Sequence, residues 1–171
     1  RPALSRISTG LKAIDLVLGG GISGSASSDK GKLMIVCARP GAGKTQFALN
    51  LGMRVAAGGD SVAMWSLEMG VKQIKMRVLA AWDHAITHSA GKPCKQLTYS
   101  MLQEHGINGR WPEEIKERLQ SETYEALETN FKVHTGGSAL TAELLCQRMR
   151  LFSRQHPSCR LFIVDHLGLL A

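Results

Sequence analysis

Aromatic residues and long hydrophobic runs are both scarce in this sequence. Only 5% of the 171 residues are aromatic, and no aromatic cluster suggests a platform for stacking the bases of a single strand. The apolar runs are far shorter than the ~20 residues that a membrane-spanning helix requires. The N-terminus also has no apolar stretch typical of a secretory signal. We therefore expect a cytoplasmic protein with no membrane partner.

The cysteines lack the spacing of a zinc site or a disulfide framework. They are Cys37, Cys94, Cys146 and Cys159, and no two of them form a Cys-x-x-Cys pair. We expect buried, reduced thiols. His84 and His88 lie four residues apart and precede Cys94, but a structural zinc site needs four ligands and no fourth one is evident. Surface or helix-capping histidines are the favoured interpretation.

The remaining composition is that of an ordinary globular domain. Hydrophobic residues make up 44% and charged residues 20% of the chain, which predicts one compact domain over residues 1–171. The chain stops at Ala171, directly after an apolar run, so we expect the domain to continue downstream. The net charge is +7, with a pI near 9.5. A basic balance favours polyanion partners such as nucleic acid, although it is also compatible with a protein that is merely basic.

Short apolar segments alternate with helical patterns along the chain. The expected strands are 33–38, 61–66, 131–135 and 160–165. The expected helices are 11–18, capped by Ser8 or Thr9, then 44–57, a long one from 71, 97–105, 112–129 and 141–155. Residues 19–31 are rich in Gly and Ser and predict a loop. This order predicts an α/β fold with a mostly parallel central sheet and helices on both faces, with ligands at the carboxyl ends of the strands.

Several of these helices have a predicted apolar face. Phe47, Leu51 and Val55 recur every four residues in the helix 44–57. The helix 141–155 is expected to turn Leu144, Leu145, Met149 and Phe152 inward. Its basic residues Arg148, Arg150 and Arg154 either contact nucleic acid or form a solvated face, and the solvated face is favoured.

A phosphate-binding loop is the strongest signal in the sequence. The P-loop pattern is Gly, four residues, then Gly-Lys-Ser/Thr, and this chain matches it at Gly43, Lys44 and Thr45 but has Ala38 in place of the first Gly. Glycines let the backbone approach phosphate oxygens, and the following helix adds its N-terminal amides. The residues expected to bind ATP are Arg39, Pro40, Gly41, Ala42, Gly43, Lys44, Thr45 and Gln46. Lys44 would reach the β- and γ-phosphates, and the Thr45 hydroxyl would bind Mg²⁺.

Two carboxylates end neighbouring predicted strands. Asp165 follows the apolar run 161–164, where a charge is costly unless it is paired or near a metal. Beside a P-loop, we interpret Asp165 as a second Mg²⁺ ligand rather than a turn residue. Glu68 follows the strand 61–66 and either activates the attacking water or is a solvent-exposed turn residue. No role is assigned to His166, which is next to Asp165.

Three stretches together resemble the C-terminal ATPase domain of DnaB-type replicative DNA helicases, in the RecA-like superfamily. They are ISTGLKAIDLVLGGGI (7–22), CARPGAGKTQFALNLGMRVA (37–56) with SLEM (66–69), and LFIVDHLGLLA (161–171). The Ala-Arg-Pro opening of the loop is typical of these helicases, so Ala38 fits the family pattern. By position, Glu68 matches the family's catalytic glutamate and Asp165 its Walker B aspartate, while Lys44 and Thr45 match the residues that bind phosphate and Mg²⁺.

The resemblance implies a RecA-like P-loop ATPase that forms a homo-hexameric ring and moves along single-stranded DNA at a replication fork. A helicase loader or a primase would be its protein partners. We expect the family's DNA-binding loops, arginine finger and N-terminal collar domain to lie outside this sequence. Three features depart from the pattern: His166 stands where Tyr is usual, Gly168 where Gln is frequent, and the loop 19–31 is long.

Two other functions are compatible with the same motifs. The long loop 19–31 is similar to those of KaiC- or RadA-like ATPases, which act in regulation or recombination. A protein that binds nucleotide without hydrolysing it, in order to assemble or load a partner, would also need a P-loop.

Overall fold

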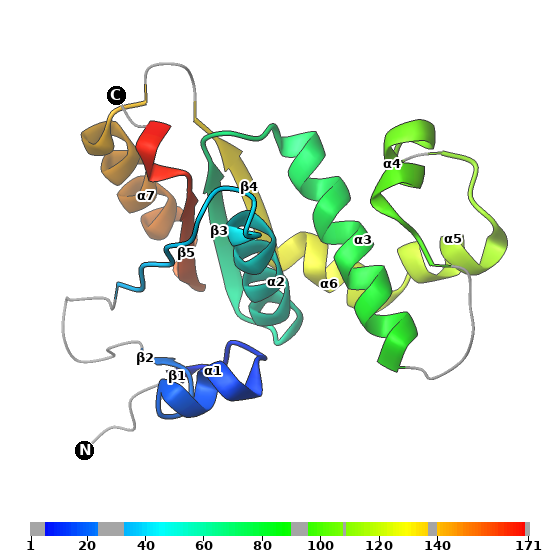
Figure 1. Ribbon diagram of the computed structural model, residues 1–171, viewed down its shortest axis with the longest axis horizontal. Coiled ribbons are helices and arrows are strands. Elements are labelled where there is room, and N and C mark those ends of the chain that lie inside the picture. Colours follow the sequence, from blue (N-terminus) through cyan, green and yellow to red (C-terminus); the bar gives the residue numbers. More distant parts are fainter. Residues whose placement is uncertain (1–5, 24–32, 90–95, 108, 137–139, 170–171) are drawn as a thin grey trace.

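A three-stranded parallel sheet lies between two layers of helices. The computed structural model describes residues 6–23, 33–89, 96–107, 109–136 and 140–169. The sheet contains β3 (Ser61–Ser66), β4 (Phe131–Thr135) and β5 (Cys159–Asp165), in the order β4-β3-β5, and both pairings are parallel. Helix α7 (Ala142–Gln155) covers one face, and α2 (Lys44–Ala57) lies on the other (Figure 1). This arrangement confirms the predicted α/β class.

The central strand β3 separates two apolar cores because successive side chains of a strand point to opposite faces. Val62 and Met64 belong to the larger core, and Ala63 and Trp65 to the smaller one. All four are at most 2% exposed. A strand buried on both faces reads as a continuous apolar run, which is why the sequence identifies β3 with its bounds correct.

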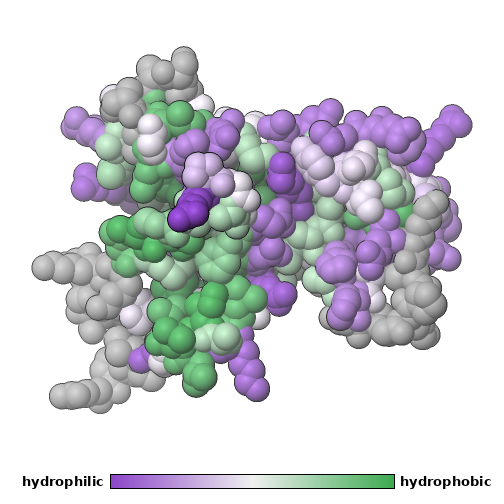
Figure 2. Space-filling view, viewed as in Figure 1, coloured by the Kyte–Doolittle hydropathy of each residue, from purple (hydrophilic) through white to green (hydrophobic). Residues whose placement is uncertain are grey.

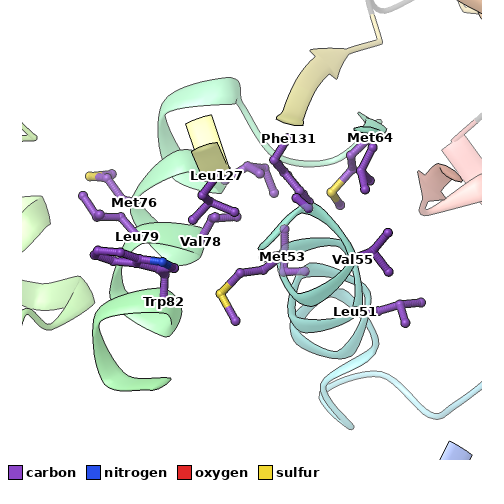
Figure 3. Close-up of a cluster of buried hydrophobic side chains, with 14 of the residues drawn as sticks. Leu51, Met53, Val55, Met64, Met76, Val78, Leu79, Trp82, Leu127 and Phe131 are labelled. Carbon is purple, nitrogen blue, oxygen red and sulfur yellow. The ribbon is translucent and has the colours of Figure 1, made fainter. Parts of the chain in front are cut away.

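The larger core joins α2, α3 (Val71–Ser89) and α6 (Glu122–Asn130) to the sheet. Figure 3 shows Met53 and Val55 of α2, Val78, Leu79 and Trp82 of α3, Leu127 of α6 and Phe131 of β4. The predicted inward positions of α2 are confirmed for Leu51 and Val55, which are buried, while Phe47 is half-buried against the same core.

The smaller core is aromatic and lies under α7. Phe152 packs edge-on against Trp65, with ring centroids 5.8 Å apart, and Leu145 is buried beside them. Met149 is half-buried as expected, but Leu144 is 37% exposed, so its predicted inward position is wrong. A helix buries a stripe about 100° wide, and Leu144 lies outside that stripe. The arginines of α7 are exposed, as both interpretations of this basic face require.

The segment 112–129 forms two helices instead of the single one expected. Helix α5 (Glu113–Leu119) ends before Ser121, whose side chain accepts a hydrogen bond from the amide of Tyr124 and caps α6. A serine that caps a new helix competes with continuation of the old one. The short helix α4 (Tyr99–His105) agrees with the segment expected at 97–105.

A buried ion pair attaches this helical region to α3. Asp83 is fully buried and accepts hydrogen bonds from Arg118 Nε at 2.6 Å and from the amide of Leu97 at 2.7 Å. The contact joins α3 and α5 to the segment before α4. Breaking such a pair by removing one partner is strongly destabilising. The sequence alone did not indicate it, because the three residues are far apart along the chain.

The N-terminal residues form a small antiparallel hairpin, β1 (Arg6–Ile7) and β2 (Ile22–Ser23), around helix α1 (Lys12–Val17). Strand β2 lies inside the segment predicted as a loop.

The expected cap by Ser8 or Thr9 is wrong, because both side chains bind the carboxylate of Asp15 instead, each at 2.7 Å. These hydrogen bonds, the Thr9 hydroxyl first, hold the pKa of Asp15 below its usual range. At Gly21, which has φ of +117°, a Cβ would lie 2.4 Å from the carbonyl oxygen of Ile7.

The expected strand 33–38 is wrong for this structure. The segment is extended but unpaired, and Leu33, Ile35 and Val36 are 85%, 69% and 46% exposed. An apolar run becomes a buried strand only beside a hydrogen-bonding neighbour, and no strand in the described part of the chain pairs with it. Figure 2 shows the resulting apolar surface, which extends over helix α1, where Leu16 and Val17 are also exposed.

The cysteine prediction is only partly correct. Cys159 is buried, and burial raises the pKa of its thiol, but Cys37 and Cys146 are exposed free thiols. Cys94 lies outside the described residues.

His84 Nδ1 lies 3.3 Å from Oε1 of Gln96, a contact that does not require a metal. Among the helices that the structure describes, none is long and apolar enough to cross a membrane.

The close approach of α2 to the sheet generates a stability prediction. Gly52 lies where a Cβ would be 2.4 Å from Phe131 and 3.0 Å from Ile163. We expect Gly52→Ala to lower the free energy of unfolding by about 1–3 kcal/mol, because overpacking exceeds the gain in helix propensity. Urea denaturation measures the change. Asn50→Ala is the control, since Asn50 donates only within its own helix, to Gln46. Equal or greater stability of Gly52→Ala would contradict the packing argument.

Candidate nucleotide site

The carboxyl ends of β3 and β5 lie side by side at one edge of the sheet. Ser66 pairs with Asp165 in the parallel ladder, and the amide of Leu67 donates to the carbonyl of Asp165 at 3.3 Å. The parallel register therefore brings the residues that follow both strands to the same place. Asp165 and Glu68 both lie at this edge, as the sequence predicted.

The P-loop enters this edge as an exposed turn. The amide of Ala42 donates to the carbonyl of Arg39 at 3.2 Å, and Arg39 and Pro40 are exposed. Gly41 and Gly43 have φ of +77° and +90°, a conformation that side chains rarely adopt, so glycine is needed at both positions. A Cβ at either position would meet nothing within 4 Å. The loop therefore has open space beside it, and helix α2 begins at Lys44 with its first amides available to an anion.

Lys44 is folded back onto its own loop. Its Nζ donates to the carbonyls of Ala38 at 3.0 Å and Arg39 at 3.2 Å. The ammonium group therefore lies over the turn that opens the loop, and it bonds to neither carboxylate. Gln46 lies in the first turn of α2, where its carbonyl accepts a hydrogen bond from Asn50.

Thr45 and Asp165 are joined directly, although 120 residues separate them. The Thr45 hydroxyl donates to Oδ2 of Asp165 at 2.9 Å. Asp165 is 8% exposed, so this bond satisfies part of the hydrogen-bonding capacity of a nearly buried carboxylate. The two residues that the sequence assigns to one metal thus share one location.

This donor set fits Mg²⁺ bound together with a phosphate. Mg²⁺ takes oxygen ligands and is typically held by one or two carboxylates plus substrate phosphates and water. A hydroxyl and a carboxylate from Thr45 and Asp165 match that pattern. Within the described ranges, no three His, Cys, Asp or Glu side chains gather into a group that could hold a metal alone. Phosphate oxygens and water would therefore complete the coordination.

Glu68 binds a residue to which the sequence assigned no role. Its Oε2 lies 2.8 Å from Nδ1 of His166, and the two side chains are 57% and 47% exposed. His166 has φ of +71°, and among the described residues it is the one non-glycine with positive φ. The positions of the two residues could have suggested this contact, because His166 follows Asp165 at the end of one strand and Glu68 follows the neighbouring strand.

Comparison with known proteins agrees with this geometry. The family model of the DnaB-like helicase C-terminal domain matches residues 6–171. A replicative DNA helicase DnaC of Bacillus subtilis is 52% identical over 58 residues, which are 33% of this chain and 13% of that protein. The DnaB helicase of Rickettsia bellii is 32% identical over 175 aligned positions, covering 96% of this chain and 30% of the relative. This chain therefore spans at most about a third of the length of these relatives.

A solved structure supports the same fold. A DnaB-like replicative helicase, described together with its interactions with primase, superposes with a TM-score of 0.57 at 23% identity, covering 78% of this chain and 29% of that one. At that identity the likeness concerns the fold alone. The family match over nearly the whole sequence, together with a P-loop and an aspartate in register, establishes that this chain belongs to the DnaB-like helicase C-terminal domain family.

Proposed function

We propose that this chain is the ATP-binding and hydrolysing motor domain of a hexameric replicative helicase that translocates on single-stranded DNA. The observation that carries the proposal is the hydrogen bond between Thr45 and Asp165. It unites the P-loop helix with the end of β5, and a P-loop ATPase needs its metal ligands at that junction. Membership in the family supports the same assignment.

The P-loop would bind the triphosphate through its backbone and Lys44. The glycines at 41 and 43 leave room for phosphate oxygens near the amides at the start of α2. Lys44 would exchange its two carbonyl partners for phosphate oxygens, which are stronger acceptors for an ammonium group. Arg39, Pro40 and Ala42 of the loop and Gln46 in the first turn of α2 would also contact the nucleotide.

Thr45 and Asp165 would hold Mg²⁺, which when bound neutralises charge on the phosphate oxygens. Glu68 would act as the general base. Its carboxylate would accept a proton from a water molecule whose oxygen attacks the γ-phosphorus, and the bond to the β-phosphate oxygen would break to leave ADP and phosphate. Glu68 is well placed for this role at the exposed edge of the sheet, where water has access.

The partners we propose are single-stranded DNA, further copies of this chain in a ring, and a helicase loader or primase. The net charge of +7 and the exposed arginines of α7 suit a polyanion. The similar solved helicase was studied with primase, which makes primase the first protein to test. Cytoplasmic localisation is part of the same proposal.

Nucleotide binding should depend on Lys44. A hydrogen bond to a charged group contributes about 1.5–3 kcal/mol, so Lys44→Ala should weaken binding of a fluorescent ATP analogue with Mg²⁺ by roughly ten- to a hundredfold. Lys72→Ala, on an exposed position of α3, is the matched control and should bind normally. Equal affinity of the Lys44 and Lys72 variants would mean that the loop is not a phosphate site.

The response of binding to Mg²⁺ should depend on Asp165. Asp165→Asn keeps an oxygen that accepts from Thr45 but loses the negative charge that attracts the cation. The affinity for the same analogue should be measured once with Mg²⁺ and once with EDTA. The two affinities should differ greatly for the unmodified protein and little for the variant. Asp60→Asn, at a carboxylate that pairs with Arg160, should keep the full difference. An unchanged Mg²⁺ response in Asp165→Asn would argue against the metal assignment.

Hydrolysis should depend on Glu68. In the full-length protein with single-stranded DNA, Glu68→Gln should bind ATP normally but hydrolyse it roughly 10²–10⁴-fold more slowly, because an amide cannot take up the proton. Glu117→Gln on the exposed face of α5 is the control. If the unmodified full-length protein binds ATP without hydrolysing it, the motor proposal fails and a nucleotide-dependent loading module is the better description.

A further inference from the structure

We propose that His166 is a positioning residue for Glu68, an inference that rests on the proposed hydrolytic function. Its Nδ1–H donates to Oε2 of Glu68 and holds the carboxylate at the edge of the sheet where β3 and β5 end. The other oxygen, Oε1, remains available to the attacking water. The sequence assigned no role to this histidine.

The first argument is the identity of the acceptor. A carboxylate that serves as a base is ionised and has only acceptor oxygens, so the hydrogen between Nδ1 and Oε2 belongs to the histidine. The contact length of 2.8 Å is that of a charge-assisted hydrogen bond. The bond to His166 therefore fixes the position of Oε2 and leaves Oε1 of Glu68 to accept from water.

The second argument is the backbone of His166. A non-glycine residue at φ of +71° costs free energy and persists only where its surroundings hold it. The residue lies between Asp165, which pairs with β3, and the turn Leu167–Leu169, in which the amide of Leu169 donates to the carbonyl of His166 at 3.0 Å. Strand and turn together fix the point from which the imidazole reaches Glu68.

The third argument is the exposure of Glu68. A side chain that is 57% exposed and lies in a turn has several accessible rotamers. A general base has to stay within reach of the water whose proton it accepts. A single hydrogen bond from a residue with a fixed backbone restricts those rotamers. His166 is joined through Asp165 to Thr45, so the base is held relative to the metal ligands.

Two substitutions separate the hydrogen bond from the backbone conformation. Asn and Gly both tolerate positive φ. The Nδ2 of Asn is separated from Cα by the same number of bonds as Nδ1 of His and can donate, whereas Gly has no donor. In the full-length protein with single-stranded DNA, His166→Gly should lower kcat by roughly tenfold, the effect of losing one hydrogen bond. The KM for ATP should not change. His166→Asn should keep kcat within about threefold, since its donor is retained.

Equal losses of kcat in the Asn and Gly variants, or no loss in either, would overturn the proposal. A rise in KM without a change in kcat would overturn it as well, because that would place His166 in nucleotide binding. Thermal unfolding of both variants verifies that the fold is intact.

A second measurement does not require hydrolysis. In full-length protein labelled with ¹⁵N-histidine and studied without nucleotide, NMR should place the hydrogen of His166 on Nδ1, with the signal assigned by its loss in His166→Asn. Glu68→Ala should shift this signal and Glu117→Ala should not. A hydrogen on Nε2 alone, or insensitivity to Glu68→Ala, would overturn the contact. If the unmodified protein lacks ATPase activity, the proposed function fails while this measurement still decides whether His166 binds Glu68.

Discussion

The parallel pairing of β3 with β5 is the constraint on which the candidate site depends. It aligns Ser66 with Asp165, so that the residues that follow each strand meet at one edge. Burial of β3 on both faces fixes this alignment, because a shift by one residue would move Met64 and Trp65 into each other's cores. The packing of α2 on the same sheet then brings Thr45 to Asp165. The core thus determines the distances between the chemical groups.

Much of this arrangement follows from short-range patterns in the sequence. The runs 61–66 and 131–135 are strands with the predicted bounds, and α2 begins and ends where the loop and the glycines after it predict. These elements have an apolar pattern that burial reinforces. The P-loop and the aspartate after β5 were recognisable because their residue types serve one chemistry at a fixed place in the fold.

The remaining features depend on neighbours that a local pattern does not reveal. Residues 33–38 have the composition of a buried strand, yet they are exposed because no described strand bonds to them. The break between α5 and α6 depends on the Ser121 hydroxyl, which caps the second helix. The contacts of Asp83 with Arg118 and of Glu68 with His166 join residues 35 and 98 positions apart, so neither could be inferred from spacing.

The bonds of Lys44 to the carbonyls of Ala38 and Arg39 lower the affinity for any anion that has to displace them. An ammonium group has three N–H donors, so an anion that takes two or three of them binds only molecules in which at least one of these bonds has opened. Its apparent dissociation constant is therefore the intrinsic one divided by the open fraction. A small anion that engages Lys44 alone gains little beyond the bonds it displaces. In the proposed function, a triphosphate with Mg²⁺ would also engage the loop amides, Thr45 and Asp165, and these contacts would offset the same cost. Such a loop would therefore favour a triphosphate over free phosphate or sulfate through the bonds that Lys44 makes without a ligand, before any contact with the base or sugar.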